Sequence, residues 1–292
     1  MNQFASSELI LNEDGSVYHL NLLPEQISDI IFLVGDPGRV PRISRHFDKI
    51  DHRSEKREFV THTGWFRGTR FSVVSTGIGT DNIDIVLNEL DALANIDLKS
   101  RTVKKDISSL TFIRLGTSGA LRASIDPGDI VVSSHGLGMD GLMHYYQRDL
   151  DKEGLKLGES FIEFCDMENI SLPLKPYGAT GSKELREKYF SDKTAGITMT
   201  ATGFYGPQSR QLRAPISSPD FFNNIRSFDF EDHMITNMEM ETAAIYGLSN
   251  ELGHQALSVN AILANRVNGV FAKDPAGVVN NMIAEVLERL SA

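Results

Sequence analysis

The sequence predicts an α/β protein with a three-layer αβα fold around a central mixed, mostly parallel sheet. Strand-like apolar runs alternate with segments of helical apolar spacing along the 292 residues, which is typical of parallel strands with helices on both faces. Several runs end in glycine-rich breaks, and open sheets of this class bind ligands at the carboxyl ends of their strands. No repeat or Pro/Gly-rich linker divides the sequence, so we expect a single domain over residues 1–292.

The first half of the chain begins this alternation. We expect strands at residues 31–34, which end at Gly35, and at residues 71–76, which end at a Gly-Ile-Gly turn. Residues 40–46 and 82–94 are expected to be helical because their apolar residues recur at helical spacing. Further strands are expected at residues 111–115 and 129–134.

The second half continues the pattern. Residues 159–167 and 183–189 have helical spacing, residues 195–202 are expected to form a strand, and an apolar run at 234–238 precedes a long helix at 240–252. A last strand is expected at residues 256–263. The chain then closes with an amphipathic helix at residues 276–290, whose apolar residues share one side.

Composition limits the function classes. A hydrophobic content of 41% is ordinary for a globular protein. The sequence has no apolar run of roughly 18–20 residues and no basic region leading into an apolar segment at its start, so we expect no membrane span and a cytoplasmic protein. The single Cys165 excludes an internal disulfide and suits a reducing compartment.

Charge argues against a nucleic acid partner. The 29 basic and 39 acidic residues give a formal net charge of −10, which disfavours a sequence-independent grip on a polyanion. A small anion can still bind where a few arginines and backbone amides meet, because nearby donors outweigh distant, screened charges.

The stretch TFIRLGTSGAL at residues 111–121 is the first candidate for such a site. It is expected to be a buried strand that breaks into a loop of small residues at 116–119, where backbone amides can approach a ligand. Arg114 lies two residues before this loop. Its planar fork and the loop donors could converge on an oxyanion such as phosphate. The alternative is that Arg114 pairs with a structural carboxylate.

Two further arginines follow similar patterns. GDPGRV at residues 35–40 joins a strand to a helix and carries Arg39, while Arg57 lies in Lys56-Arg57-Glu58-Phe59 before residues 60–65. Two buried strands that each end beside small residues and an arginine suggest one shared anion. Taken alone, GDPGRV is better explained as a strand–turn–helix connector.

Glu239-Met240-Glu241 places two carboxylates around a methionine at an expected helix start. Acidic residues in a first helical turn are favoured by the helix dipole. Glutamate also suits the vicinal hydroxyls of a sugar, and methionine offers a flexible apolar surface to a ribose face. Both interpretations remain open.

Four of these motifs together resemble the nucleoside phosphorylase family, which includes uridine phosphorylase and the hexameric purine nucleoside phosphorylases. They are GDPGRV, STGIG at residues 75–79, RLGTSGAL at 114–121 and NMEMET at 237–242, in that order. The resemblance extends from about His19 to the closing helix. It implies reversible phosphorolysis of a nucleoside, with inorganic phosphate as co-substrate and with no other cofactor and no metal.

The resemblance also implies roles for individual residues. Catalytic roles fall to Arg39, Arg114 and Arg210. Phosphate is expected to be held by Gly35, Arg39, Arg114, Thr117 and the partner's Arg57. Ribose is expected to contact Glu239, Met240, Glu241 and, at its 5′-hydroxyl, the partner's His19. Each site therefore needs two chains, and the minimal unit is expected to be a homodimer.

FYGPQSR at residues 204–210 looks like the pyrimidine-recognition segment of uridine phosphorylases. There Gln208 and Arg210 are expected to hold the uracil edge, with Phe204 stacking on the base. The alternative is a solvated loop face, and Gly206-Pro207 reverses the family's usual Pro-Gly. Ala264-Asn265-Arg266 lacks the acid that purine enzymes carry, so the chain resembles the uridine branch.

Some alternatives stay open on sequence alone. A purine nucleoside phosphorylase, a nucleosidase on the same fold and a non-catalytic nucleoside-binding protein remain rivals, as do thymidine and deoxyuridine as substrates. Residues 95–110 look like a surface insertion, which in this family favours a dimer over a ring of three dimers. Glu58 matches a segment that binds a monovalent cation in some members, but no other ligands for a cation are evident.

Overall fold

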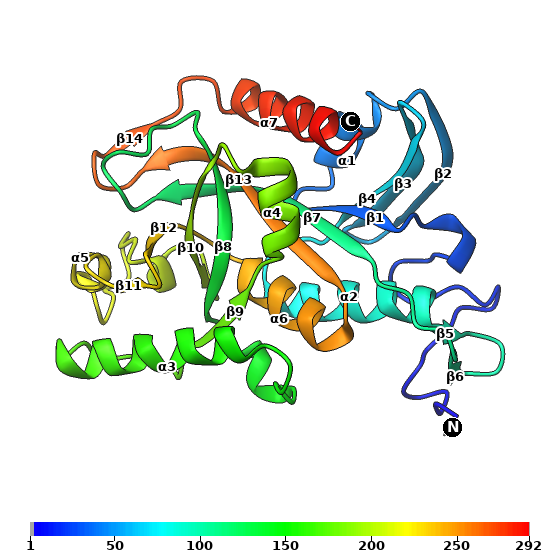
Figure 1. The fold of residues 1–292 in the computed structure, drawn as a ribbon, viewed down its shortest axis with the longest axis horizontal. Helices are drawn as coiled ribbons and strands as arrows, with labels where there is room; N and C mark the ends of the chain where they lie inside the picture. Colours follow the sequence, from blue (N-terminus) through cyan, green and yellow to red (C-terminus); the bar gives the residue numbers. More distant parts are fainter. Residues whose placement is uncertain (1–2, 292) are drawn as a thin grey trace.

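The computed structural model describes residues 3–291 and confirms the α/β class (Figure 1). Within these residues, a twelve-stranded sheet has the order β11-β12-β10-β8-β13-β7-β1-β4-β3-β2, with β14 paired to β13 and β9 to β8. Its strands are β1 (Ile30–Val34), β2 (Lys49–Lys56), β3 (Phe59–Phe66), β4 (Thr69–Ser75), β7 (Thr111–Ala120), β8 (Ile130–Met139), β9 (Tyr177–Thr180), β10 (Thr194–Ala201), β11 (Asp229–Phe230), β12 (His233–Glu239), β13 (Gln255–Asn265) and β14 (Val270–Phe271). The α-helices are α1 (Arg39–Ser44), α2 (Thr80–Asn95), α3 (Lys152–Met167), α4 (Lys183–Phe190), α5 (Phe221–Ile225), α6 (Thr242–Leu252) and α7 (Pro275–Leu290).

The sheet is mixed, with parallel pairing among its long central strands. β7 is parallel to both β1 and β13, and β10 is parallel to both β8 and β12. β13 and β8 are antiparallel, and β2 and β3 add an antiparallel edge beside β4. The parallel pairs bring the ends of β1, β7 and β13 to one side of the sheet.

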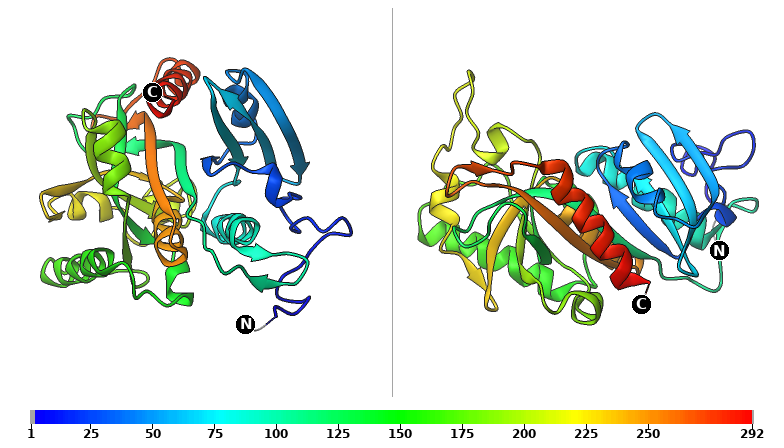
Figure 2. Two further views of the ribbon diagram at one scale, coloured as in Figure 1. Left: turned by 45° about the vertical axis from the view of Figure 1, so that its right-hand side comes forward. Right: turned by 90° about the horizontal axis from the view of Figure 1, so that it is seen from above.

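Part of the sheet closes on itself. β12 pairs with the end of β7 through Asn237 with Ala120 and Met238 with Gly119. This pairing joins β7, β13, β8, β10 and β12 into a small barrel, whereas the sequence had suggested an open sheet. The barrel lies beside the β1 to β4 part of the sheet in both views of Figure 2. Its interior therefore comes from strands that are distant in sequence.

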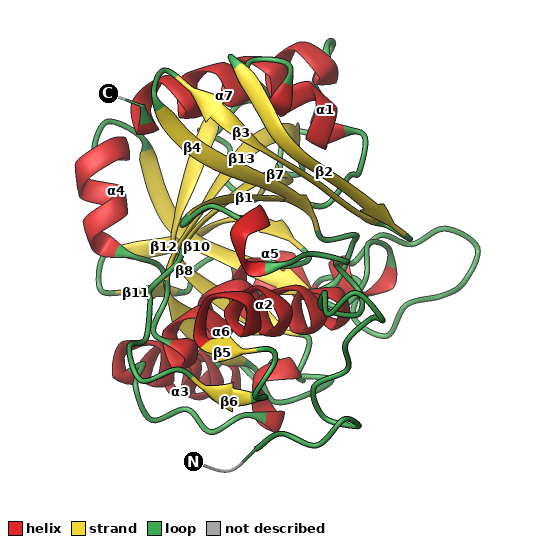
Figure 3. Cartoon of the chain, turned by 90° about the vertical axis from the view of Figure 1, so that its right-hand side faces the viewer, coloured by secondary structure: helices red, strands yellow, loops and turns green. Residues whose placement is uncertain are grey.

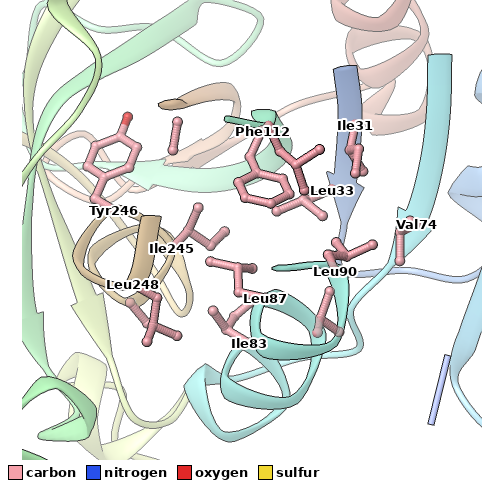
Figure 4. Packing of buried hydrophobic residues seen from close by; sticks show 14 of the residues in the cluster. Ile31, Leu33, Val74, Ile83, Leu87, Leu90, Phe112, Ile245, Tyr246 and Leu248 are labelled. Carbon is pink, nitrogen blue, oxygen red and sulfur yellow. The ribbon is translucent and has the colours of Figure 1, made fainter. Parts of the chain in front are cut away.

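Helices cover the sheet on opposite sides. α7 lies above it in Figure 1, and α2, α6 and α3 lie below it. In the lower layer, Leu87 of α2 and Ile245 of α6 pack against Leu33 and Phe112 of the sheet (Figure 4). A second buried cluster joins α1, α4 and α7 to the upper face, and a third joins α3 and α5 to the barrel wall. Within residues 3–291, no helix combines the length and apolarity that crossing a membrane requires.

Local signals explain where several helices begin. The side chains of Asp151, Ser182 and Asp274 each precede a helix and accept a hydrogen bond from a backbone N–H in its first turn. α7 also has proline at its first position, where the missing N–H costs nothing. α6 ends at Leu252 and is followed by Gly253, whose φ of 78° is the left-handed conformation that glycine adopts readily.

The structure corrects the sequence interpretation at several points. The expected loop at residues 116–119 is strand, because β13 pairs with β7 along its whole length and holds the small residues extended. β8 and β13 likewise continue beyond their expected ends. α6 begins at Thr242 and not at residue 240. β2 had not been predicted, because its mixed polar sequence KIDHRSEK has the character of an exposed edge strand.

Residues 95–110, which were expected from the sequence to be a surface insertion, form a short hairpin. Its strands are β5 (Ile96–Asp97) and β6 (Thr102–Val103), which extend from the end of α2 (Figure 3). Lys104 Nζ donates a 2.6 Å hydrogen bond to the carbonyl of Ala94 and so caps the last turn of α2. The carbonyl of Arg101 accepts from the backbone N–H of Phe4. The hairpin thus anchors the N-terminal segment that leads to His19.

The layer of α2 predicts a large stability effect at Leu87. Leu87→Ala should lower the free energy of unfolding by about 2–5 kcal/mol, because the fully buried side chain leaves a cavity. Leu212→Ala is the matched control, since Leu212 is exposed, and it should change stability by less than about 0.5 kcal/mol. Urea unfolding of both variants measures the difference, and equal effects would contradict this packing.

Candidate active site

A cavity of about 380 Å³ opens where the ends of β1, β7 and β12 meet the connection that follows β10. Most of the residues singled out in the sequence line it. They are Gly35, Arg39, Arg114, Thr117, Phe204, Gln208, Arg210, Glu239, Met240 and Glu241. A larger, more apolar cavity of about 730 Å³ lies beyond Arg210 and shares only that residue with the smaller one. The smaller cavity, which holds most of the charged side chains, is therefore the candidate active site.

Arg114 is buried at the centre of the cavity wall. Its Nη2 lies 2.8 Å from Glu239 Oε2 and 2.5 Å from Glu241 Oε2, and its Nη1 donates a 2.9 Å hydrogen bond to Asn260 Oδ1. Burial opposes its charge, but the two carboxylates outweigh that effect and raise the pKa of Arg114. Arg114 thus pairs with carboxylates, as the alternative interpretation expected, and it also lines the cavity. Its binding of an oxyanion stays a prediction.

Gly116 is required by the side chain of Arg114 and not by a turn. A Cβ atom at Gly116 would lie 1.6 Å from Arg114 Nη1, which is impossible without displacing the guanidinium. Arg114 and Gly116 are two residues apart on one strand and so share a face. The glycine leaves the space in which the arginine folds back along β7.

The two glutamates have different surroundings. The carboxylate of Glu239 accepts hydrogen bonds from Thr200 Oγ1 at 2.7 Å and from the backbone N–H groups of Glu241 and Thr242 at 3.0 Å. Glu239 thus caps the start of α6 and anchors Arg114 at the same time. Glu241 accepts from the Gly79 N–H at 2.8 Å. Burial, with the nearby Glu239 charge, raises the pKa of Glu241 although Arg114 opposes this.

Arg39 brings a second positive charge to the cavity. Its Nη1 donates a 2.8 Å hydrogen bond to the carbonyl of Leu115, and its buried Nε has no hydrogen-bond partner among residues 3–291. Burial and the charge of Arg114 lower the pKa of Arg39 to about 10, so it stays protonated at neutral pH. Two guanidinium groups beside the Gly35 turn form a site suited to a small anion.

The residues expected to hold a base meet at another part of the cavity wall. Gln208 is buried in the short 3₁₀ turn η3 (Gly206–Gln208), and its Oε1 accepts a hydrogen bond from Arg210 Nη1. The guanidinium of Arg210 stacks over the ring of Phe204 at 4.0 Å. The connection that carries them, yellow-green in Figure 2, projects from the body of the molecule.

Sequence reasoning missed Arg266. It follows the end of β13, donates a 2.6 Å hydrogen bond to the carbonyl of Gln208 and lies over Gly119. Burial and the charge of Arg210 lower the pKa of Arg266 to about 10. The signal was an arginine near the end of an expected buried strand, the feature that had drawn attention to Arg39 and Arg114. Asn265 faces elsewhere, because its Nδ2 donates to the carbonyls of Arg122 and Ile125.

His19 and Arg57 lie apart from this cavity within the chain. The carboxylate of Glu89 binds His19 Nδ1 at 2.6 Å and accepts from the backbone N–H groups of His19 and Leu20. Arg57 is exposed in the turn between β2 and β3. Lys56, the residue before it, donates to the carbonyl of Tyr18. His19 and Arg57 are thus held on one connected surface.

Comparison with known proteins shows the family of the chain. A family model for the phosphorylase superfamily matches residues 29–291. The chain is 31% identical to the uridine phosphorylase of Thermococcus kodakarensis over 94% of this chain and 86% of that protein. It is 26% identical to a DeoD-type purine nucleoside phosphorylase of Oceanobacillus iheyensis over 93% and 98% of the two chains.

A solved structure has the same architecture. A Trypanosoma brucei nucleoside phosphorylase, described as showing uridine phosphorylase activity, superposes with a TM-score of 0.86 at 30% identity and covers 98% of this chain and 100% of its own. The chain therefore belongs to the phosphorylase superfamily. Within it, its relatives and its fold are those of the nucleoside phosphorylases, which are pentosyltransferases.

The geometry at Gly116 predicts a specific defect. Gly116→Ala should displace the Arg114 guanidinium and weaken binding of inorganic phosphate at least about tenfold, because hydrogen bonds to a charged group contribute about 1.5–3 kcal/mol each. The backbone of Gly116 is not in the left-handed region, so the fold should tolerate alanine. Calorimetric titration with phosphate measures the effect.

Gly119→Ala in the same strand is the matched control. A Cβ atom at Gly119 would have its nearest neighbour at 3.4 Å, which is an ordinary contact. This variant should bind phosphate within about threefold of the parent. Parent-like phosphate affinity in a folded Gly116→Ala protein would remove Arg114 from the phosphate site.

Proposed function

We propose that the protein catalyses the reversible phosphorolysis of uridine to uracil and ribose 1-phosphate, as in pyrimidine salvage. One observation carries the proposal. The cavity has Arg39 and Arg114, a pair suited to an anion, in one part of its wall, and Gln208 and Arg210 in another. Arg266 donates a hydrogen bond to the carbonyl of Gln208, which also accepts from Arg210 through its side chain. Uridine phosphorylase activity in the two relatives of about 30% identity supports it.

The base end favours uracil over a purine. The Gln208 amide can accept from the uracil N3–H and donate to one carbonyl, while Arg210 donates to the other. Uracil leaves as an anion, and Arg210 with the neighbouring Arg266 would stabilise that charge. A purine leaves most easily when an acid protonates its ring, and neither a guanidinium nor the turned-away Asn265 supplies such a proton near neutral pH.

The other end suits phosphate and ribose. Phosphate would be held by Gly35, Arg39, Arg114 and Thr117. As Arg114 Nη2 turns to phosphate, Glu241 is freed to accept from the ribose hydroxyls beside Met240. Glu239 keeps its place as the cap of α6. The rate would come from holding phosphate beneath the anomeric carbon and from stabilising the cationic sugar.

The proposed minimal unit is a homodimer that shares its sites. His19 and Arg57 lie away from the cavity of their own chain but on one surface, as expected if both act in a neighbouring subunit. There Arg57 would bind phosphate and His19 would contact the ribose 5′-hydroxyl. The hairpin at residues 95–110 protrudes beside the N-terminal segment (Figure 3) and, by the resemblance, favours a dimer over a ring of dimers.

Substrate selectivity tests the base assignment. We expect uridine to be cleaved only in the presence of phosphate, with kcat/KM at least about a hundredfold above that of inosine or cytidine, because buried polar groups reject a mismatched base strongly. Rates for all three nucleosides, with and without phosphate, measure this. Phosphate-independent release would indicate a nucleosidase, no cleavage a binding protein, and a preference for inosine a purine enzyme.

Subunit complementation tests the shared site. Arg57→Ala and Arg114→Ala should each be nearly inactive, since each removes a phosphate ligand. After subunit exchange, the mixture should recover up to about a quarter of parent activity, because about half of the dimers are mixed and each has one intact site of two. That site combines the unmutated Arg114 of one subunit with the unmutated Arg57 of the other. Exchange is verified by mass spectrometry. Absence of recovery in an exchanged mixture would place both arginines in one chain's site.

A further inference from the structure

The barrel formed by β7, β13, β8, β10 and β12 contains a chain of buried polar side chains that begins at Arg114. Arg114 Nη1 donates to Asn260 Oδ1 at 2.9 Å. Asn260 Nδ2 donates to the hydroxyl of Ser133 at 3.1 Å and to that of Ser258 at 3.2 Å. The Ser133 hydroxyl shares a 2.5 Å hydrogen bond with Thr198. This chain of hydrogen-bonded side chains thus crosses the barrel from β7 to β10.

From Thr198 the chain of hydrogen-bonded side chains leads back to the cavity wall. Thr198 Oγ1 donates to Asn237 Oδ1 at 2.9 Å, and Asn237 Nδ2 donates to Ser118 Oγ at 2.9 Å. Ser118, like Arg114, lines the cavity and belongs to β7. Buried polar groups are costly unless they are hydrogen-bonded, so this connected arrangement calls for an explanation beyond packing.

The orientation of the Asn260 amide is determined by its neighbours. Its oxygen faces the guanidinium of Arg114, which can only donate, and its NH₂ faces the hydroxyls of Ser133 and Ser258. A flipped amide would place two donors against each other. Asn260 also lies beside Gly116 in the β7–β13 ladder, where a Cβ atom at Gly116 would come within 2.9 Å of Asn260 Oδ1. The glycine therefore leaves room for both partners of this hydrogen bond.

Asn260 differs from the other partners of Arg114 in charge. Glu239 and Glu241 hold Nη2, the nitrogen that must reach an anion, and their negative charges compete with that anion. Asn260 holds Nη1 and is neutral. It can therefore keep the guanidinium in place while Nη2 changes partner, without repelling the incoming charge.

We propose that Asn260 is a positioning residue that aims Arg114 at phosphate, and that Ser133 and Ser258 hold Asn260 in turn. The identity of the anion as phosphate rests on the proposed function. The arrangement itself rests on the hydrogen bonds and on the space beside Gly116.

Asn260→Leu tests the proposal, because leucine keeps the volume and removes the acceptor. The KM for phosphate and the dissociation constant of inorganic phosphate should rise at least about tenfold, the usual factor for a lost hydrogen bond to a charged group. The KM for uridine should stay within about threefold. A purely structural role would instead change both KM values and kcat together, and that result would overturn the proposal.

Thr198→Val is the matched control. It is isosteric and equally buried. It removes the hydrogen bonds of Thr198 to Ser133 and to Asn237, but it leaves the bonds of Asn260 to Arg114, Ser133 and Ser258 in place. Its phosphate KM should stay within about threefold of the parent, although its stability falls. A phosphate defect as large as that of Asn260→Leu would count against a specific role for Asn260.

If Asn260→Leu does not fold, the double variant Ser133→Ala and Ser258→Ala replaces it. That variant keeps Asn260 and removes both acceptors of its NH₂, along with the bonds of these hydroxyls to Thr198 and Thr242. The phosphate KM should rise at least about threefold, and parent-like affinity would overturn the proposal. Calorimetry with inorganic phosphate tests the role of Asn260 separately from the proposed function. A parent protein that binds phosphate without cleaving uridine would refute the proposed function, while phosphate affinities of the variants would still decide the role of Asn260.

Discussion

A buried guanidinium is the constraint on which the site depends. Arg114 is almost inaccessible to solvent, and a charge in such a position is tolerated only when several partners satisfy it. Those partners are Glu239 at the end of β12, Glu241 at the start of α6 and Asn260 in β13. Residues more than a hundred positions apart in the chain must therefore meet at one point, and the closure of β12 onto β7 is the part of the fold that brings the two glutamates there.

This ion-paired cluster is better explained by function than by stability. Removing two carboxylates and a guanidinium from water costs several kcal/mol per ion, so apolar side chains of similar volume often stabilise a core as well or better. What the cluster provides is a rigid cation at the edge of a cavity. Glu239 contributes twice, because the oxygens that hold Arg114 also accept the first free N–H groups of α6. Helix and arginine are thereby fixed with respect to each other.

The electrostatic surroundings of Gln208 and Arg210 differ from those of Arg114. Arg210 and Arg266 bond to carbonyl oxygens and to the side chain of Gln208, and the charge of Arg210 lowers the pKa of Arg266. Their positive charge is therefore not neutralised by nearby carboxylates to the extent seen at Arg114. Within the described part of the chain, the cavity thus has an arginine paired with carboxylates at one place and arginines without carboxylate partners at another. This arrangement suits a reaction in which a nucleophilic anion enters and a second anion leaves.

The sequence by itself determined the α/β class, most of the helices and the motif residues that line the cavity. These follow from local periodicity, from arginines beside small residues at strand ends and from four motifs in a fixed order. Only the tertiary structure decided the rest. The run from Gly116 to Gly119 became strand because β13 and β12 pair with it, and short-range propensity cannot anticipate a pairing with a strand more than a hundred residues away. The roles of Asn260 within β13 and of Arg266 directly after it were hidden for the same reason. A polar residue in or beside an apolar strand has no visible role until closure of the barrel shows which groups it faces.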